Sequence, residues 1–308
     1  MNFRDFSGFT AARRKSPWGA VALFFALALP VHANIVLKDD TGREIRLKAP
    51  AKRIVALAPH IAENLYAAGA GDRLVGTVDY SDYPPAAKVL PRVGGYSRVD
   101  LEAVAALKPD LVLAWESGNN MPQIDKLRAL GLTVHVSQPN TMDSVADDLE
   151  RLGKLAGTEA AANTAANAFR QRLATLRQSN TGKPPVRTFY QIWKTPLMTV
   201  GGPQIISDAI KLCGGENIFG HLKQMAPNVT VEAVLEANPE AIIATGMGDA
   251  KPEWLHDWDK WTRMTAVARG NLFHINPDIM QRHTPRILDG TEKLCAHLDV
   301  ARSRRSTK

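Results

Sequence analysis

Two stretches of the chain, LEAVAALKPDLVLA at 101–114 and VEAVLEANPEAIIA at 231–244, decide the fold. They match at five of fourteen positions, and most of the other positions keep their chemical character. Each copy predicts an amphipathic helix, a proline-containing turn and a buried apolar strand. Because a segment with a helical pattern separates the copies, the repeat predicts two similar lobes joined by helix. A chance similarity between two amphipathic helix–strand units is the alternative.

Short apolar runs alternate with helical runs on both sides of the first copy. Residues 35–38 and 44–47 alternate around Asp40-Thr41-Gly42, which predicts a β-hairpin. Further strands are expected at 53–57, 74–78, 111–115 and 133–136, with helices at 61–68, 101–107 and 124–130. A second alternating region runs from Val186 to about Val300. This order indicates an α/β fold with mainly parallel sheets.

The segment from Met142 to about Ser179 has a different composition. It contains no proline, and Leu149, Leu152 and Leu155 keep one apolar face. One long helix or two helices in tandem would satisfy this pattern. We therefore divide the chain into a leader at 1–33, an α/β lobe at 34–141, a linking helix at 142–180, a second α/β lobe at 181–300 and a basic disordered tail at 301–308.

The first 33 residues are typical of a secretory signal peptide. A basic triplet at 13–15 precedes an apolar run at 18–31, which is too short to cross a bilayer comfortably. The sequence VHA at 31–33 predicts cleavage after Ala33. We therefore expect a periplasmic protein, without a lipid anchor because no cysteine follows the run. A membrane anchor or a buried helix is the alternative interpretation.

The formal net charge of +7 is concentrated at the two ends of the chain. The leader holds four basic residues and one acid, which leaves about +4 on the rest. Four more basic residues, Arg302, Arg304, Arg305 and Lys308, belong to the tail, so the remaining body is close to neutral. A body without a basic excess argues against nucleic-acid binding. No other segment is apolar enough for stable membrane insertion, and we expect a monomer.

Two cysteines, Cys213 and Cys295, occur in a chain that is expected to enter an oxidising compartment. One disulfide is the natural expectation there. Two buried free thiols are the alternative. A metal site is less well supported, because no paired Cys/His spacing accompanies either residue.

Motifs of the common enzyme classes are missing from the sequence. It contains no GxSxG, no HExxH and no GxxxxGK[ST]. The histidines after the leader fall at no spacing that defines a metal site; they are His60, His135, His221, His256, His274, His283 and His297. The sequence therefore favours a binding protein without catalytic activity and without a resident cofactor.

Aromatic residues follow several of the predicted strands. Tyr80 and Tyr83 belong to the loop 79–85, Tyr96 follows a glycine pair, and Trp115 ends a strand. Loops that leave strand ends are where α/β folds bind their ligands. Tyr and Trp combine apolar area with a polar group, which suits a large ligand with a polar rim. Packing over the lobe cores is the alternative, above all for Tyr83.

Four motifs stand together in the order and spacing of one known family: YSDYPP at 80–85, DLEAVAALKPDLVLAW at 100–115, CGGENIF at 213–219, and PRI at 285–287 before LC at 294–295. Over roughly 52–300 the chain resembles the periplasmic cobalamin-binding proteins of ABC importers. They belong to the helix-linked (class III) substrate-binding proteins, which also receive siderophores and haem. The resemblance implies two Rossmann-like lobes joined by one long α-helix, and a Cys213–Cys295 disulfide in the second lobe.

The resemblance also implies the residues that contact the ligand. The corrin-contacting aromatics of the family fall on Tyr80, Tyr96 and Trp115, with Tyr96 in place of a Trp. The Asp/Arg pair that meets the rim of the ligand falls on Asp278 and Arg282.

Two other aromatics of the family pocket are not reproduced, because Met198 and Ala226 occupy those places. His60 follows Ala58-Pro59 at the start of a helix that is expected to face the cleft. Contact with the cobalt or iron of a ligand is one interpretation of His60. Packing or solvation at the helix start is the other.

Glu102 and Glu232 hold the same place in the two copies of the repeat. The resemblance implies that each pairs with arginines of a permease dimer, one from each lobe. Two anions on separate lobes fit a two-fold partner. An interaction of each carboxylate with the positive end of its own helix is the alternative. The predicted function is therefore capture of cobalamin and delivery to an ABC permease and its ATPase.

A haem or ferric-siderophore receptor on the same fold is the first alternative function. Haem requires a strong axial ligand such as His60 or Tyr80, and an anionic siderophore requires more cleft cations than Arg282. A periplasmic metalloenzyme or metal-transfer protein using His60 with His274 or His283 is the alternative of another class.

Overall fold

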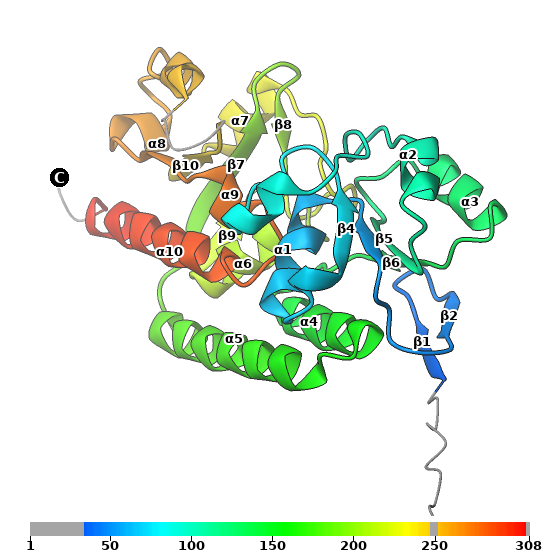
Figure 1. The fold of residues 1–308 in the computed structure, drawn as a ribbon. Helices are drawn as coiled ribbons and strands as arrows, with labels where there is room; N and C mark the ends of the chain where they lie inside the picture. The colour runs from blue at the N-terminus through cyan, green and yellow to red at the C-terminus, as the bar shows by residue number, and fades with distance from the viewer. Residues whose placement is uncertain (1–33, 247–251, 306–308) are drawn as a thin grey trace, which may run out of the picture. The chain divides into compact units, whose positions relative to one another are not determined.

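We call residues 34–141 the first half of the chain. Their apolar runs form a parallel sheet of four strands, ordered β4-β3-β5-β6, in the computed structural model (Figure 1). The structure describes residues 34–246 and 252–305. The strands are β3 (Ile54–Ala56), β4 (Leu74–Thr77), β5 (Leu111–Trp115) and β6 (Val134–Ser137). Apolar clusters cover both faces of this sheet, which explains why its two central strands, β3 and β5, are continuously apolar rather than alternating. The four predicted strands are confirmed.

The predicted hairpin and helices of the first half are also confirmed. Strands β1 (Ile35–Lys38) and β2 (Glu44–Leu47) pair antiparallel around Gly42, whose φ of +81° suits glycine. Asp100 and Asn120 cap their helices by accepting a backbone hydrogen bond from the third helical residue. The helices are α1 (Pro59–Ala67), α2 (Leu101–Ala106) and α3 (Met121–Ala129), with 3₁₀ turns η1 (Gly71–Arg73) and η2 (Pro85–Val89).

The second half of the chain, from residue 181 onward, contains a five-stranded sheet. Its neighbouring strands are β11, β10, β7 and β8 in that order, and β9 also pairs with β7. All pairs are parallel except β7 with β8. The strands are β7 (Val186–Trp193), β8 (Met198–Thr199), β9 (Gly215–Asn217), β10 (Ala241–Ala244) and β11 (Leu272–His274). The helices are α6 (Ile205–Leu212), α7 (Val231–Ala237), η3 (Glu253–Trp258), α8 (Thr265–Ala268), α9 (Pro277–Met280) and α10 (Ile287–Ser303).

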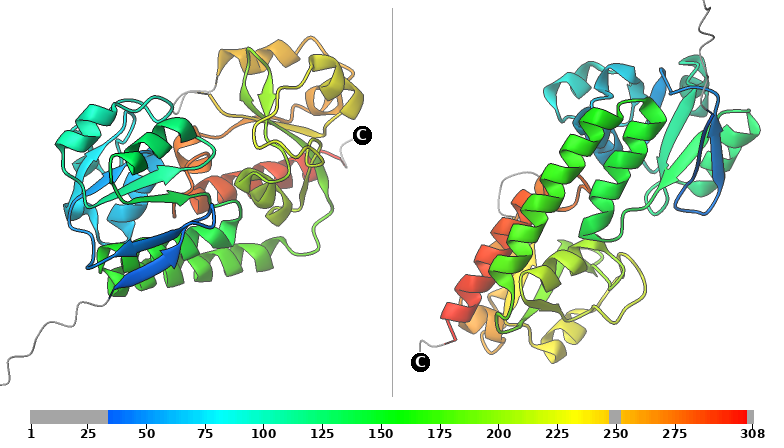
Figure 2. Two further views of the ribbon diagram at one scale, coloured as in Figure 1. Left: turned by 90° about the vertical axis from the view of Figure 1, so that its right-hand side faces the viewer. Right: turned by 90° about the horizontal axis from the view of Figure 1, so that it is seen from below.

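The segment between the sheets consists of two helices, α4 (Met142–Ala156) and α5 (Glu159–Asn180), which lie side by side in Figure 2. They are antiparallel, because Arg177 pairs with Asp143 while Arg170 pairs with Glu150. Gly157 breaks the helix with a left-handed φ of +67°. Of the two interpretations of 142–180, that of two successive helices is confirmed and that of one continuous linking helix is wrong. Of the two helices, α5 leads the chain into β7.

A single apolar cluster continues from the first half into the second. It joins one face of each sheet to α1, α4, α5, α6 and α10. Two smaller clusters cover the other faces, one beneath α2 and α3 and one beneath α7 and α8. The shared cluster makes the connection between the halves a packed core rather than a flexible hinge.

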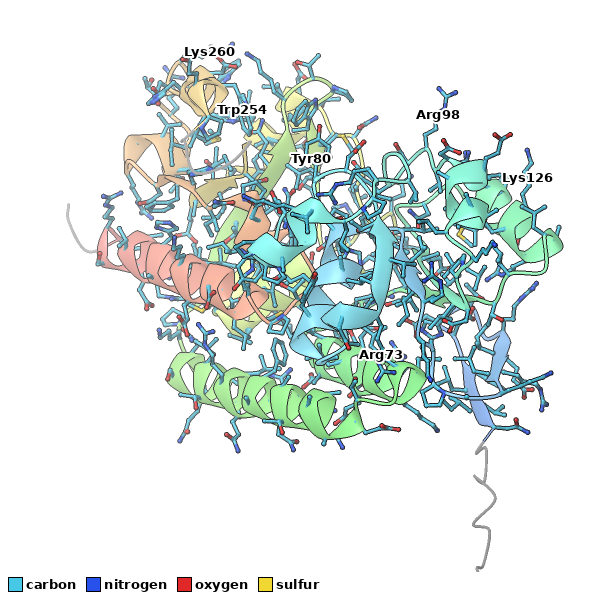
Figure 3. All side chains as sticks on the ribbon, viewed as in Figure 1. Arg73, Tyr80, Arg98, Lys126, Trp254 and Lys260 are labelled. Atoms are coloured by element: carbon cyan, nitrogen blue, oxygen red, sulfur yellow. A yellow bond between two sulfur atoms is a disulfide. The ribbon has the colours of Figure 1, made fainter. Side chains whose placement is uncertain are left out.

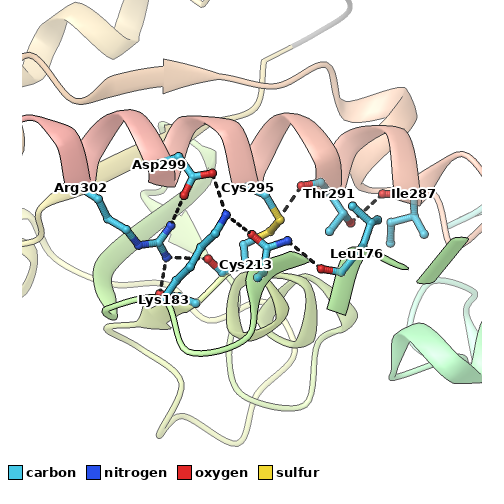
Figure 4. Close-up of a disulfide and its surroundings, with 10 residues drawn as sticks. Leu176, Lys183, Cys213, Ile287, Thr291, Cys295, Asp299 and Arg302 are labelled. Atoms are coloured by element: carbon cyan, nitrogen blue, oxygen red, sulfur yellow. Dashed lines mark hydrogen bonds and ion pairs between the residues drawn. A yellow bond between two sulfur atoms is a disulfide. The ribbon is translucent and has the colours of Figure 1, made fainter. Parts of the chain in front are cut away.

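The predicted disulfide is confirmed in the second half. Cys213, at the end of α6, is bonded to Cys295 in the middle of α10 (Figure 4). Beside it, Lys183 donates to Asp299 and to Asn180, which ties α10 to the end of α5. The bond therefore holds two helices on one face of the second sheet.

The sequence predicts a disordered basic tail at residues 301–308. For the described residues of this tail, 301–305, the prediction is wrong. Helix α10 continues to Ser303. Arg302 donates to the carbonyl oxygens of Cys213 and Gly214, which the end of α6 leaves without helical partners (Figure 4). Arg305 forms an ion pair with Glu240. The cations of the tail therefore cap and pair with groups of the second half.

The predicted signal peptide at 1–33 and the last three residues, 306–308, lie outside the described residues. Among the helices that the structure describes, none has both the length and the apolar character that a membrane crossing requires. The lobe boundaries at 141 and 181 stay a prediction.

Candidate ligand-binding site

The carboxyl ends of the parallel strands position most of the predicted binding residues. His60 follows β3, Tyr80 follows β4 and Trp115 ends β5. From the second half, Asp278 and Arg282 follow β11. Ligand sites of open α/β sheets lie at these strand ends, so the two sheets contribute to one candidate site.

Four rings from both halves form a contact group that we call the aromatic cluster: His60, Tyr96, Trp115 and His283. The centroid of Trp115 lies 5.0 Å from His60, 5.8 Å from His283 and 6.2 Å from Tyr96. The two imidazole centroids are 5.2 Å apart. The structure thus brings together three predicted residues and adds His283, which the sequence offered only as a partner for a metal.

The two histidines of the cluster are held in their neutral form. His60 is 4% exposed and His283 is 2% exposed. Burial, followed by the nearby His283 and Arg282, holds the pKa of His60 well below its ordinary value. Burial alone lowers the pKa of His283 to about 4. No described residue bonds to Nε2 of His60, to either ring nitrogen of His283 or to the indole nitrogen of Trp115.

Arg282 provides the charged edge of the candidate site. Its guanidinium is 2.8 Å from Asp278, and the role predicted for this pair at the rim of a ligand stays a prediction. It is also 2.7 Å from Asp82 of the first half. Burial works against the charge of Asp82, but the hydrogen bond from Arg282 prevails and lowers the pKa of Asp82. The Arg282 guanidinium also lies 3.9 Å from Glu63 on α1, so a cation with three acidic partners joins the Tyr80 loop and α1 to the segment after β11.

Glu63 forms a buried polar contact between the halves that was not predicted from the sequence. Both of its oxygens accept from Arg286 at 2.6 Å, and Thr284 donates to it at 2.7 Å. The neighbouring Asn64 donates to the carbonyl oxygen of His283. We call these contacts the Glu63 clamp. The signal in the sequence was a pair of polar residues, Glu63-Asn64, inside an apolar helical run.

The clamp also explains the place of Tyr83. The Arg286 guanidinium lies 3.7 Å from the centroid of the Tyr83 ring, a cation–π contact. Burial opposes the charge, but the bonds to Glu63 raise the pKa of Arg286. Tyr83 therefore packs on the clamp.

Tyr80 is presented to solvent. Its side chain is 68% exposed, and Figure 3 shows it on the loop after β4. Its φ of +64° is uncommon for a bulky residue and stores backbone strain, which concentrates at functional sites. In the described part of the chain Tyr80 makes none of the ring contacts of the aromatic cluster.

Met198 and Ala226 lie in the second half. Met198 is half-buried in β8, opposite Trp193, and forms a β-bridge with Asn228. Ala226 is exposed. Met198 and Ala226 have no aromatic rings. The two aromatic residues that the family has at these positions are therefore missing from the expected pocket.

Tryptophans of the second half line a separate pocket that the sequence analysis did not find. Trp254, Trp258 and Trp261 surround a volume of about 310 Å³ next to Val231. The indole N–H of Trp258 donates to Gln191 at the end of β7. The available signal was the spacing of these three tryptophans by four and three residues, although the structure has a 3₁₀ turn there that ends at Trp258.

The two glutamates of the repeat are both exposed. Glu102 is the second residue of α2 and Glu232 is the second residue of α7. Neither carboxylate forms an ion pair with another described residue. Each is therefore available to a cationic partner, and each also favours the positive end of its own helix.

Comparison with known proteins connects this geometry to a family. Residues 54–279 match the periplasmic binding protein family. The chain belongs to this family. The vitamin B12-binding protein of Vibrio cholerae is 40% identical over 253 residues, which cover 82% of this chain and 91% of that protein. The vitamin B12-binding protein of Yersinia pestis is 37% identical over 248 residues, which cover 80% and 86%.

Solved structures agree with this family assignment. The crystal structure of the periplasmic vitamin B12 binding protein BtuF of Vibrio cholerae matches with a TM-score of 0.76 and 38% identity, over 82% of this chain and 98% of that one. The periplasmic heme-binding protein RhuT from Roseiflexus sp. RS-1 matches with a TM-score of 0.69 and 21% identity, over 82% and 99%. The second likeness shows the shared fold alone. Among the described residues no group of three or more His, Cys, Asp or Glu side chains is arranged to hold a metal ion.

Proposed function

We propose that this protein captures cobalamin or a related corrinoid in the periplasm and delivers it to an ABC importer. The observation that carries the proposal is the 40% identity to a vitamin B12-binding protein over 82% of the chain. In this proposal the corrinoid is cargo rather than a cofactor, and the protein acts as a binding protein rather than an enzyme. Export by the predicted signal peptide at 1–33 belongs to the same proposal.

In this function Tyr80, Tyr96 and Trp115 contact the apolar faces of the corrin. Trp115 and Tyr96 already lie in one cluster, and an exposed Tyr80 is available to cover a ligand. Aromatic rings suit a large flat macrocycle because they bury a wide apolar area. His60, beneath the indole of Trp115, and Met198 line the same proposed site.

Arg282 and Asp278 are proposed to bind the polar rim of the ligand. Cobalamin carries amide groups around its corrin ring, and these both donate and accept hydrogen bonds. A guanidinium beside three carboxylates offers donors and acceptors at one place. The Asp278–Arg282 pair therefore supports recognition of an amide rim.

Retention of the ligand tests the proposal. Purified protein is incubated with cyanocobalamin, haemin or a ferric hydroxamate, desalted, and examined by visible absorption. A retained cobalamin spectrum at one equivalent is expected. Substitution Trp115→Ala should abolish retention, because it removes the central ring of the aromatic cluster. Trp261→Ala, in the separate tryptophan pocket, is the matched control and should retain the ligand.

Retention of haemin alone would instead favour the haem receptor on the same fold. Retention of the ferric hydroxamate alone would favour a siderophore receptor. Stoichiometric zinc in the purified protein, lost in His60→Ala, would favour the metal-binding alternative. Each of these outcomes contradicts the proposed cargo.

Glu102 and Glu232 are proposed to dock on the two subunits of a permease dimer, with the binding protein as a monomer. Their exposure and their equal places on α2 and α7 support this role. The variant Glu102→Ala with Glu232→Ala should bind ligand normally and fail to support uptake in reconstituted vesicles. The pair Glu159→Ala with Glu236→Ala removes two other exposed glutamates and should leave uptake unchanged. Loss of ligand binding in the first variant would contradict this assignment.

A further inference from the structure

One buried amide ties together the loops that carry the aromatic cluster. Asn119 is 7% exposed and lies four residues after Trp115. Its Oδ1 accepts from the backbone N–H of Trp115 at 2.6 Å. Its Nδ2 donates to the carbonyl oxygen of Tyr96 at 2.6 Å and to that of Leu57 at 2.8 Å. Three separate segments therefore meet at one side chain.

These bonds occupy both donors of the Asn119 amide and one of the two lone pairs of its oxygen. Both N–H donors therefore have partners, and the occupied lone pair of the carbonyl oxygen accepts from Trp115. The partners also fix its orientation, because only Oδ1 can accept from Trp115 and only Nδ2 can donate to two carbonyl oxygens. The backbone N–H of Asn119 donates in turn to the carbonyl oxygen of Trp115 at 2.9 Å. The peptide groups on both sides of the Trp115 Cα are therefore bound to one residue.

The turn between these residues also positions the Trp115 ring. A Cβ on residue 118 would overlap the six-membered ring of the indole at Cε3 and Cζ3. The indole therefore lies directly over the Cα of Gly118, in space that any other residue would fill. The hydrogen bonds to Asn119 fix the position of the Trp115 backbone. The missing side chain of Gly118 leaves the space that the indole ring occupies.

We infer that the turn from Trp115 to Asn119 presets the aromatic cluster for its ligand, with Asn119 as a positioning residue and Gly118 as the position that admits the indole. The inference rests on the proposed function and extends it to residues that do not touch the ligand. Rings already held in their binding orientation lose less freedom on association, so presetting strengthens affinity. The fitting ligand class is a flat, largely apolar macrocycle with a polar rim.

Two substitutions separate the parts of this device. Asn119→Asp keeps the shape and the acceptor for Trp115 but removes both donors, so it releases Tyr96 and Leu57. Gly118→Ala keeps all these hydrogen bonds but displaces the indole. Both should weaken cyanocobalamin binding by about tenfold or more, which corresponds to ~1.4 kcal/mol. Isothermal titration calorimetry measures the effect, well below the melting temperature of each variant.

Gln123→Ala is the matched control. Gln123 lies in the same half and also ties a loop, because it accepts from the N–H of Val99 and donates to its carbonyl oxygen. It contacts no ring of the aromatic cluster. A merely structural role for Asn119 predicts equal affinity in Asn119→Asp and Gln123→Ala once both are folded. The inference predicts near-normal affinity in Gln123→Ala alone.

A ligand-independent measurement keeps the inference separable from the proposed function. The near-UV circular dichroism of Trp115 is obtained by subtracting the spectrum of Trp115→Phe from that of the wild type. Asn119→Asp and Gly118→Ala should both change this signal in the ligand-free protein, and Gln123→Ala should not. If the wild type retains haemin instead of cobalamin, the proposed function fails and the same affinity series is measured with haemin. An unchanged signal, or equal affinity in Asn119→Asp and Gln123→Ala, overturns the inference.

Discussion

The two copies of the repeat build the same unit at two places in the molecule. In the first copy Asp100 caps α2, and in the second Thr230 caps α7, each by accepting from the third helical N–H. Val104 and Val234, three residues into each helix, are fully buried. Each helix then leads to a buried strand, β5 or β10, that lies between two parallel neighbours.

The copies differ in the residues that come after the strand. Strand β5 ends in Trp115 and the turn to Asn119, which holds the aromatic cluster. Strand β10 ends before Thr245, whose hydroxyl accepts from Gln281 and whose backbone N–H donates to Gln191. The shared part of the repeat therefore sets the backbone frame, and the residues just beyond the strand decide the chemistry. The polar contacts that join the two halves, namely the Glu63 clamp and the Arg282 ion pairs, belong to neither copy.

Removal of the disulfide should give the largest effect, and it should fall on the second half. The bond closes a separation of 82 residues, and the chain-entropy model gives roughly 4–5 kcal/mol for a loop of that length. The double variant Cys213→Ala with Cys295→Ala should lose about that much free energy of unfolding in urea. Hydrogen exchange should show the loss in β7, α6 and α10 before β3 to β6.

The single variants Cys213→Ala and Cys295→Ala serve as controls, because either one removes the bond. Each should be about as destabilised as the double variant. Additive losses would show that packing of the sulfur atoms matters more than the crosslink. Equal loss of exchange protection in both sheets would contradict the contrast between the halves.

Breaking the Glu63 clamp tests how much the polar contact between the two halves, which lies outside both copies of the repeat, contributes to stability. Glu63 is 3% exposed and pairs with Arg286 through two hydrogen bonds. Removing one partner of a buried ion pair typically costs about 3–5 kcal/mol. Glu63→Ala should therefore lower the free energy of unfolding by about this amount, measured by urea denaturation. The exposed Glu159→Ala is the control, and a loss below about 1 kcal/mol in Glu63→Ala would show that the clamp is dispensable.

Acid should lower the free energy of unfolding through His283, which lies beside the Glu63 clamp. Its pKa in the folded protein is about 4, below its ordinary value of 6.5, so the unfolded chain takes up the proton first. The contribution of the buried, neutral His283 to the free energy of unfolding is complete above pH 6.5 and is lost as the pH falls toward 4. The size of this loss is about 3 kcal/mol at 1.36 kcal/mol per pKa unit.

Unfolding measured between pH 7 and pH 4 checks this expectation. His283→Gln should flatten the decline of stability relative to the wild type, and His60→Gln should act in the same direction. The exposed His256→Gln is the control and should follow the wild type. Identical pH slopes in His283→Gln and the wild type would contradict the assignment.

The sequence predicted the parts of the fold and the site that depend on local pattern. Apolar runs predicted the strands, and Tyr96 and Trp115 stood out as aromatics after strands. Glu63 and Asn119 were missed because their partners, Arg286 and Leu57, are remote along the chain and a single sequence contains no pairing information. The tail was mispredicted for the same reason, since the carbonyl partners of Arg302 follow α6.

Loss of the helix caps should give the smallest effect and should be equal in the two copies. Asp100→Ala and Thr230→Ala each remove one side-chain acceptor at a helix N-terminus. Such a loss typically costs about 1 kcal/mol. Thermal unfolding of the two variants, compared with Thr262→Ala on an exposed loop, measures it. A twofold or larger difference between Asp100→Ala and Thr230→Ala would show that the copies are not equivalent.

Calorimetric titration of the purified protein with cyanocobalamin shows whether the aromatic cluster binds a corrinoid. We expect one site with a dissociation constant below tens of micromolar, and loss of that site in Trp115→Ala while Trp261→Ala still binds. Absence of binding by the folded wild type, or equal binding by Trp115→Ala, would contradict this expectation.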